Sequence, residues 1–328
     1  MPRMMDLIRR AYNETADKAR FDVSYTREFL EKSVVIDMGN VYNYLIDTNQ
    51  WKWDTLDKLP NVAPAYPLMF FEYKMDAHTY QGWSVKTWDY EKDDDIPGHD
   101  VVAGAKWYVR FLMWAFNEKA PDMTPHVYGE AFIGSDGKLL ACDQYKDGNP
   151  AYFRLDVVQD SPLVQFAPAL LKEELDKAAK NGVINVDNDL PPHLRIVSDI
   201  AFMAALGCTA VLWSMCFLQV RNLEKIENVP PEKLSKKHQK KHGSPLVKYY
   251  TMKILPMKKG KKFGSDSEPK GGSHNAPALH IRAGHFKEFT DAAPLFGKWV
   301  GVYWWNTTDV GKKERGQVIK DFDIDMAE

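Results

Sequence analysis

A run of 21 residues without a charged side chain, from Ile200 to Val220, constrains the fold of this chain more than any other feature. A helix of this length is long enough to span a bilayer. Gly207, Thr209 and Ser214 interrupt the apolar pattern, however, and the chain holds no second run of this kind. We therefore expect a helix that is buried on most of its sides in the protein core rather than a membrane span.

This central helix is predicted to cover about 196–227. The residues after it, Val229-Pro230-Pro231, mark its end, because proline lacks the N–H group that a continuing helix needs. Further helices are predicted over 1–20, as an ordinary surface helix, and over 168–181, where Pro168 suits the first turn and Gly182 the end.

Strands are predicted where apolar and polar side chains alternate. The segments are 68–74, 82–90, 101–116 and 247–254. Period-two spacing favours a strand over a helix in 101–116. A hairpin is predicted over 127–145, around Ser135-Asp136-Gly137, because glycine readily takes the positive φ of such turns. Residues 258–275 are rich in Gly, Ser and Lys and indicate a loop.

These elements predict an α+β fold: a mixed, mainly antiparallel sheet packed on the central apolar helix. Residues 1–190 form an N-terminal α+β part. Residues 191–328 form a C-terminal part with the buried helix, a basic arm and a His/Trp hairpin in which 298–305 pairs with a strand opened by His280. The two parts make either one continuous body or two subdomains.

Charge is distributed unevenly along the 328 residues, although the net charge is only −2. Residues 221–262 hold 13 Lys and Arg against 3 Asp and Glu, whereas 1–220 hold 22 against 32. A basic segment on an acidic body indicates an anionic partner or an internal electrostatic match. The three cysteines are too few and irregular for a disulfide framework, and the start of the chain carries no secretory pattern, so we expect a cytoplasmic protein.

The densest basic cluster is typical of a nucleic-acid patch, and its alternative is a solvated linker face. Its lysines are Lys233, Lys236, Lys237, Lys240 and Lys241. Trp304 and Trp305 are candidates for stacking on bases. Aromatic residues in an apolar strand belong more often to the core, but two adjacent residues of a strand point to opposite faces.

A second candidate site lies in the segment that contains His280, Arg282, His285 and Lys287. Two imidazoles with an arginine and a lysine suit cleavage of RNA without a metal: one His removes the 2′-hydroxyl proton, the other protonates the leaving oxygen, and the cations stabilise the transition state. The alternative is a structural role, in which these groups hydrogen-bond within the hairpin. His274, His280 and His285 lack the signature of a metal site, and we expect none.

The C-terminal third resembles an uncharacterised family of phage and prophage proteins. The resemblance rests on VPPEKLSKKHQKKHGSPLVKYYTMKI, LHIRAGHFKEF and PLFGKWVGVYWW, and covers about 229–305. Where the family has Arg-Gly-His, this chain has Arg282-Ala283-Gly284-His285, with an alanine inserted. The resemblance implies a phage protein that acts in the bacterial cytoplasm, and it implies no catalytic residue.

Together these features predict a phage-type accessory protein that contacts nucleic acid through the basic segment and the His/Arg/Trp hairpin. Two alternatives stay open: a metal-independent ribonuclease, and a non-enzymatic inhibitor that binds a host protein. We expect no cofactor, because the chain holds no Walker loop and no dinucleotide fingerprint, and we expect no membrane partner.

Overall fold

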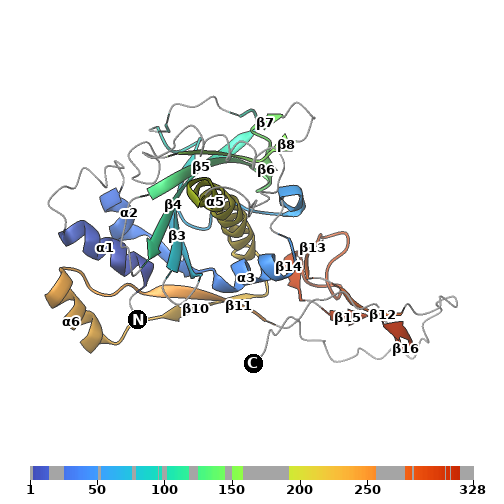
Figure 1. Cartoon of the computed structure of the whole chain (residues 1–328). Coiled ribbons are helices and arrows are strands. Elements are labelled where there is room, and N and C mark those ends of the chain that lie inside the picture. Colours follow the sequence, from blue (N-terminus) through green and yellow to red (C-terminus); the bar gives the residue numbers. More distant parts are fainter. Residues whose placement is uncertain are drawn as a thin grey trace.

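The structure, a computed structural model, describes residues 3–14, 26–50, 53–75, 79–94, 96–97, 102–117, 125–144, 150–157, 192–255, 278–282, 284–306, 308–310 and 312–317. The fold is α+β, as predicted: a large mixed sheet carries helices on both faces, and a long apolar helix packs against one of them (Figure 1). The predicted segments 168–181 and 258–275 lie outside the described residues.

The main sheet has the strand order β10-β11-β1-β2-β3-β4-β5-β6, and β9 also pairs with β5. β1 is parallel to both β11 and β2, while the other neighbours are antiparallel. The strands are β1 (Val34–Asp37), β2 (Leu68–Lys74), β3 (Thr79–Asp89), β4 (Ala105–Asn117), β5 (Pro125–Gly134), β6 (Leu139–Leu140), β9 (Phe153–Val157), β10 (Leu223–Asn228) and β11 (Tyr249–Ile254). The strands and the hairpin predicted from the sequence are confirmed, with φ +80° at Gly137 in the turn. Both parts of the chain contribute to this sheet, because β11 joins it beside β1.

One face of the sheet is covered by α5 (Pro192–Phe217), with α3 (Gly39–Asp47) and the 3₁₀ helix η2 (Trp53–Lys58) beside it. Among the described helices α5 has the length and apolarity to cross a membrane, yet 89% of its window Ile200–Phe217 is buried inside the protein. The prediction of a buried central helix is therefore confirmed. Its surroundings on this face are apolar side chains of the sheet, such as Phe71, Val85 and Phe111.

Gly207 lets α5 approach the sheet closely. A Cβ atom at Gly207 would lie 2.3 Å from the indole nitrogen of Trp83, which is fully buried on β3. The Trp83 Nε1–H has no hydrogen-bond partner among the described residues. The indole is thus held by packing, and the helix meets the sheet at a position where any larger residue than glycine would clash.

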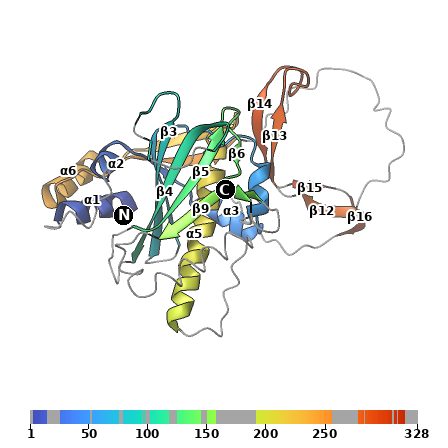
Figure 2. The same cartoon turned by 90° about the horizontal axis from the view of Figure 1, so that it is seen from above.

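The opposite face is covered by α1 (Met4–Glu14) and α2 (Thr26–Lys32). Met4, Met5 and Ile8 of α1 pack with Phe29 of α2 against Phe70 of β2. A further helix, α6 (Glu232–His242), lies beside α1 at this end of the molecule, as both views show (Figure 2). The central strands are therefore buried on both faces.

The central helix is shorter at its C-terminal end than predicted. It ends at Phe217 instead of about 227, and Leu223–Asn228 form β10. Residues of β10 pair with all of β11 at the edge of the sheet, and this ladder satisfies backbone groups of β11 that would otherwise be an unpaired edge. This edge strand carries the charged residues Glu224, Lys225 and Glu227, and charges on an edge discourage pairing with a strand of another chain.

The predicted pairing of the C-terminal hairpin is wrong in one respect. β14 (Gly301–Trp305) pairs with β13 (His285–Phe289), whereas β12 (Ala278–Arg282), which contains His280, pairs with β15 (Thr308–Val310) and β16 (Lys312–Gln317). The short chain between β13 and β14 closes an antiparallel hairpin more readily than the longer chain from β12. Another small ladder joins β7 (Asp143–Gln144) to β8 (Pro150–Ala151).

Gly207→Ala should lower the free energy of unfolding, although alanine is the better helix former by about 1 kcal/mol. The new methyl group has to displace the buried indole of Trp83, and such overpacking costs about 1–3 kcal/mol. Chemical denaturation of Gly207→Ala, Trp83→Phe and the double variant measures this. The cost of Gly207→Ala should shrink in the Trp83→Phe background; equal costs in both backgrounds would contradict the assigned contact.

Candidate nucleic-acid interface

The basic cluster forms the helix α6. It begins after Pro231, places Glu232 in its first turn and Lys240, Lys241 and His242 in its last turn, and ends at Gly243 with φ +79°. An acidic residue near the N-terminus and basic residues near the C-terminus stabilise a helix, because each is opposite in sign to the partial charge of the helix dipole at that end. Glycine at the end adopts the left-handed conformation that side chains disfavour. Local sequence alone therefore accounts for both ends of α6.

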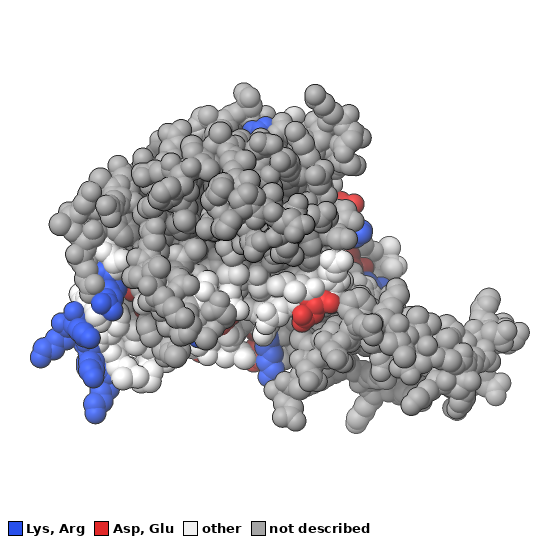
Figure 3. All heavy atoms as spheres, in the orientation of Figure 1, with Lys and Arg blue, Asp and Glu red and all other residues white. Residues whose placement is uncertain are grey.

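Five lysines form one stripe along α6, which we call the lysine stripe. They lie at positions i, i+3, i+4, i+7 and i+8, the spacing that places side chains on one face of a helix. The stripe consists of Lys233, Lys236, Lys237, Lys240 and Lys241. All five side chains are exposed, and α6 has no buried residue. Figure 3 shows Lys and Arg side chains projecting at the lower left, where α6 lies.

The other side of α6 is attached to the body by hydrogen bonds. The Ser235 hydroxyl accepts the Leu246 N–H at 3.1 Å, and His238 Nδ1 lies 2.8 Å from the Ser244 carbonyl oxygen. The Asn13 side-chain amide of α1 donates to the carbonyl of His242 at 3.2 Å. These bonds hold the helix in one orientation, so the lysine stripe faces outward.

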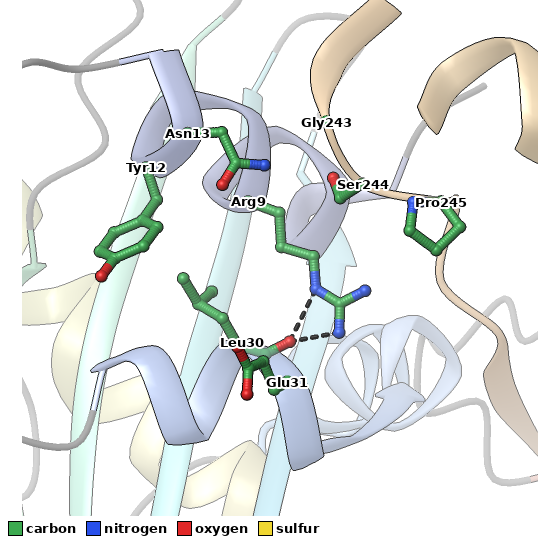
Figure 4. Close-up of a pocket in the computed structure, with 8 residues that line it drawn as sticks. All are labelled: Arg9, Tyr12, Asn13, Leu30, Glu31, Gly243, Ser244 and Pro245. Atoms are coloured by element: carbon green, nitrogen blue, oxygen red, sulfur yellow. Dashed lines mark hydrogen bonds between the residues drawn. The ribbon is translucent and has the colours of Figure 1, made fainter. Parts of the chain in front are cut away.

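A pocket of about 440 Å³ opens beside the C-terminal end of α6 (Figure 4). We call it the α6 pocket, and its walls come from α1, α2 and the turn after α6. The residues that line it are Arg9, Tyr12, Asn13, Leu30, Glu31, Gly243, Ser244 and Pro245. Arg9 is fixed in the pocket because its Nε and Nη2 both donate to the Leu30 carbonyl oxygen, the former at 2.7 Å.

The α6 pocket was not predicted from the sequence, because residues 1–20 were expected to form an ordinary surface helix. Arg9, Tyr12 and Asn13 stand at i, i+3 and i+4, so they share one face of α1. That spacing was readable from the sequence. The approach of Ser244 and Pro245, more than 200 residues later in the chain, was not.

The second predicted contact, the β13–β14 hairpin, is fastened to the main sheet by Asn222. Its side-chain amide donates to the Trp304 carbonyl and accepts the Trp304 N–H, both at 2.9 Å, and it also donates to Leu255 at 3.2 Å. The Arg221 N–H donates to the Val302 carbonyl at 2.9 Å. Asn222 thus acts for Trp304 as a neighbouring strand would.

Trp304 is a core residue, which corrects its prediction as a base-stacking residue. It is 4% exposed and packs edge-on against Tyr44, Phe217 and Phe286. Its neighbour Trp305 points to the other face, as alternation along a strand requires, and is partly exposed. The apolar side of the hairpin faces α3 and α5, and this contact buries Trp304.

The four residues predicted for RNA cleavage are carried by two separate sheets. His285 and Lys287 share one face of β13, where the His285 ring stacks 6.5 Å from Trp305 and Lys287 Nζ lies 5.4 Å from the same ring. His280 and Arg282 lie on β12, opposite Val310 and Thr308 in register. The structure describes the backbone of β12 but not its side chains, so the ribonuclease site stays a prediction.

The lysine stripe and the hairpin stand at opposite ends of the main sheet in both views (Figures 1 and 2). α6 lies beside α1, whereas β13 and β14 lie beyond α3. The two do not form one continuous surface, which corrects the prediction that both belong to one nucleic-acid contact. The lysine stripe and the adjoining α6 pocket are therefore the candidate interface.

An ionic cluster around the buried Glu72 anchors α1 near this interface. Glu72 and Asp37 are neighbours in register on β2 and β1, and Arg3 contacts both carboxylates, with 3.0 Å to Asp37. Glu72 also accepts the Met5 N–H at 3.1 Å. Burial raises the pKa of Glu72 to about 7, against the favourable effect of Arg3. Within the described residues no group of three or more His, Cys, Asp or Glu is arranged to hold a metal ion.

In comparisons with known proteins, no protein-family model, curated protein or solved structure matches the chain.

Burial of Glu72 should make the protein lose stability as the pH rises. Its folded pKa, about 7, lies above the unfolded value near 4.5, so the contribution is fully present below pH 4.5 and is lost between pH 4.5 and 7. Relative to the wild type, Glu72→Gln should gain about 1–3 kcal/mol of unfolding free energy across that window. Denaturation at several pH values measures the difference. The exposed Glu91→Gln serves as control, and parallel profiles for wild type and Glu72→Gln would refute the assignment.

Proposed function

We propose that this is a phage-type accessory protein that contacts nucleic acid through the lysine stripe of α6. The observation that carries the proposal is the outward stripe of five exposed lysines on a helix that buries no residue. Lysines three and four residues apart repel one another by about 0.2–0.5 kcal/mol per pair, which opposes the favourable effects of the helix dipole on Lys240 and Lys241 and of Glu232 on Lys236. A bound polyanion attracts each lysine and screens the repulsion between them. The resemblance of 229–305 to phage proteins supports the phage-type setting.

The dimensions of the stripe suit a phosphate backbone. From Lys233 to Lys241 the helix rises about 12 Å, which corresponds to roughly three or four phosphates at about 3.4 Å per nucleotide of one strand. Each lysine that neutralises a phosphate releases condensed counterions. With all five engaged, the logarithm of the association constant should fall with the logarithm of the salt concentration with a slope of about −3 to −5.

Lys237→Gln/Lys241→Gln should weaken binding to DNA and RNA and reduce the magnitude of the salt slope by about 1 to 2. The measurement is fluorescence anisotropy with labelled oligonucleotides over a series of salt concentrations. Lys92→Gln/Lys138→Gln removes the same charge from two exposed lysines on turns of the main sheet and should leave the slope unchanged. Absence of binding by the wild type at low salt, or equal slopes for both variants, would count against the proposal.

One observation favours the alternative function, binding of a host protein. The loop between β13 and β14 exposes three apolar side chains, with Phe296 at 64%, Trp299 at 52% and Val300 at 40%. The loop is ordered by backbone bonds between Leu295 and Trp299. Apolar groups that a fixed turn holds in solvent are typical of a contact for another protein.

Phe296→Ser/Trp299→Ser should abolish capture of a protein partner from nuclease-treated bacterial lysate, while the wild type retains it. The matched control is Ile226→Ser/Val229→Ser, which removes two exposed apolar side chains outside the loop. Mass spectrometry of the captured proteins gives the readout. If all three proteins capture the same set, or none captures any protein, host-protein binding through this loop is ruled out.

A further inference from the structure

The α6 pocket adjoins the lysine stripe, and its chemistry differs from that of the stripe. Lys240 and Lys241 lie in the last turn of α6, and Gly243 and Ser244, which follow directly, form one wall of the pocket. The bond from Asn13 to His242 fixes the α1 wall against the end of the helix. The C-terminal end of the lysine stripe and the pocket are therefore joined by the turn at Gly243 and Ser244.

We infer that the α6 pocket takes an unpaired nucleobase, so that the interface prefers single-stranded over duplex nucleic acid. The inference rests on the proposed function of the lysine stripe. It names the class of ligand, a single strand of DNA or RNA, and the residues that discriminate it from a duplex.

The walls of the pocket offer hydrogen-bonding groups for the edge of a base and packing surfaces for its face. Arg9 and Asn13 supply hydrogen-bond donors, and Glu31 supplies an acceptor. Tyr12 at one edge of the pocket and Pro245 at the other provide faces for packing (Figure 4).

Size and access favour an unpaired base over a paired one. The volume of about 440 Å³ lies within the range of small-ligand sites. In a duplex the base edges are paired and the faces are stacked, so a base enters a pocket only after it is flipped out of the helix. A single strand offers its bases directly, and aromatic side chains stack on them with little dependence on sequence.

The test compares a single-stranded oligonucleotide with a duplex of equal length by anisotropy at one salt concentration. The wild type should bind the single strand at least about fivefold more tightly, and Tyr12→Ala should remove most of that preference while the salt slope stays the same. Tyr90→Ala, a partly buried tyrosine outside the pocket, is the control. Because Tyr12→Ala also removes packing around α1, Tyr12→Leu provides a second variant that keeps apolar bulk but lacks the aromatic face, and it should lose the preference as well.

A fluorescent base analogue, 2-aminopurine placed within the single strand, gives a second readout. Its fluorescence should change on binding to the wild type and change less with Tyr12→Ala, because the base leaves the stacked strand for the pocket. Equal affinity for single strand and duplex, with the predicted salt slope intact, would overturn the inference and leave the proposed function standing. Loss of all salt-dependent binding would remove both.

Discussion

The close packing of α5 on the main sheet is the contact on which the rest of the structure depends. Gly207 brings the helix against the indole of Trp83, so apolar side chains along Ile200–Phe217 meet one face of the sheet without a gap. α5 covers this face, and α1 and α2 cover the other, so the central strands are buried on both sides.

Ionic and polar groups then fix the elements that the apolar core does not hold. Arg3 and Glu72 tie the start of α1 to β2, and Asn222, in the turn before β10, bonds to β14 and to Leu255 after β11. Each is a buried polar contact of high cost if broken, since the remaining partner stays unsatisfied. α6 differs from these elements, because it buries no residue and keeps its charge in solvent. The fold thus positions α6 without using it for stability.

The distribution of charge agrees with this division. Residues 221–262 hold 13 Lys and Arg against 3 Asp and Glu, whereas 1–220 hold 22 against 32, and the five lysines of the stripe are exposed at one end of the main sheet (Figure 1). The loop between β13 and β14 at the other end exposes Phe296, Trp299 and Val300, and exposed apolar side chains also occur at Val229 and Leu234, before and within α6.

The sequence by itself determined the elements whose signals are local. The charge-free run 200–220 predicted the buried helix, Asp136-Gly137 predicted the hairpin turn, and the cluster from Lys233 to Lys241 predicted a basic surface. Tertiary structure decided which strand pairs with Gly301–Trp305, that Leu223–Asn228 leave the helix for the sheet edge, and that Trp304 is core. It also brought Arg9 and Tyr12 beside Ser244. Pairing, burial and pockets depend on contacts between distant segments, and neither the period of a pattern nor its composition specifies which segments will meet.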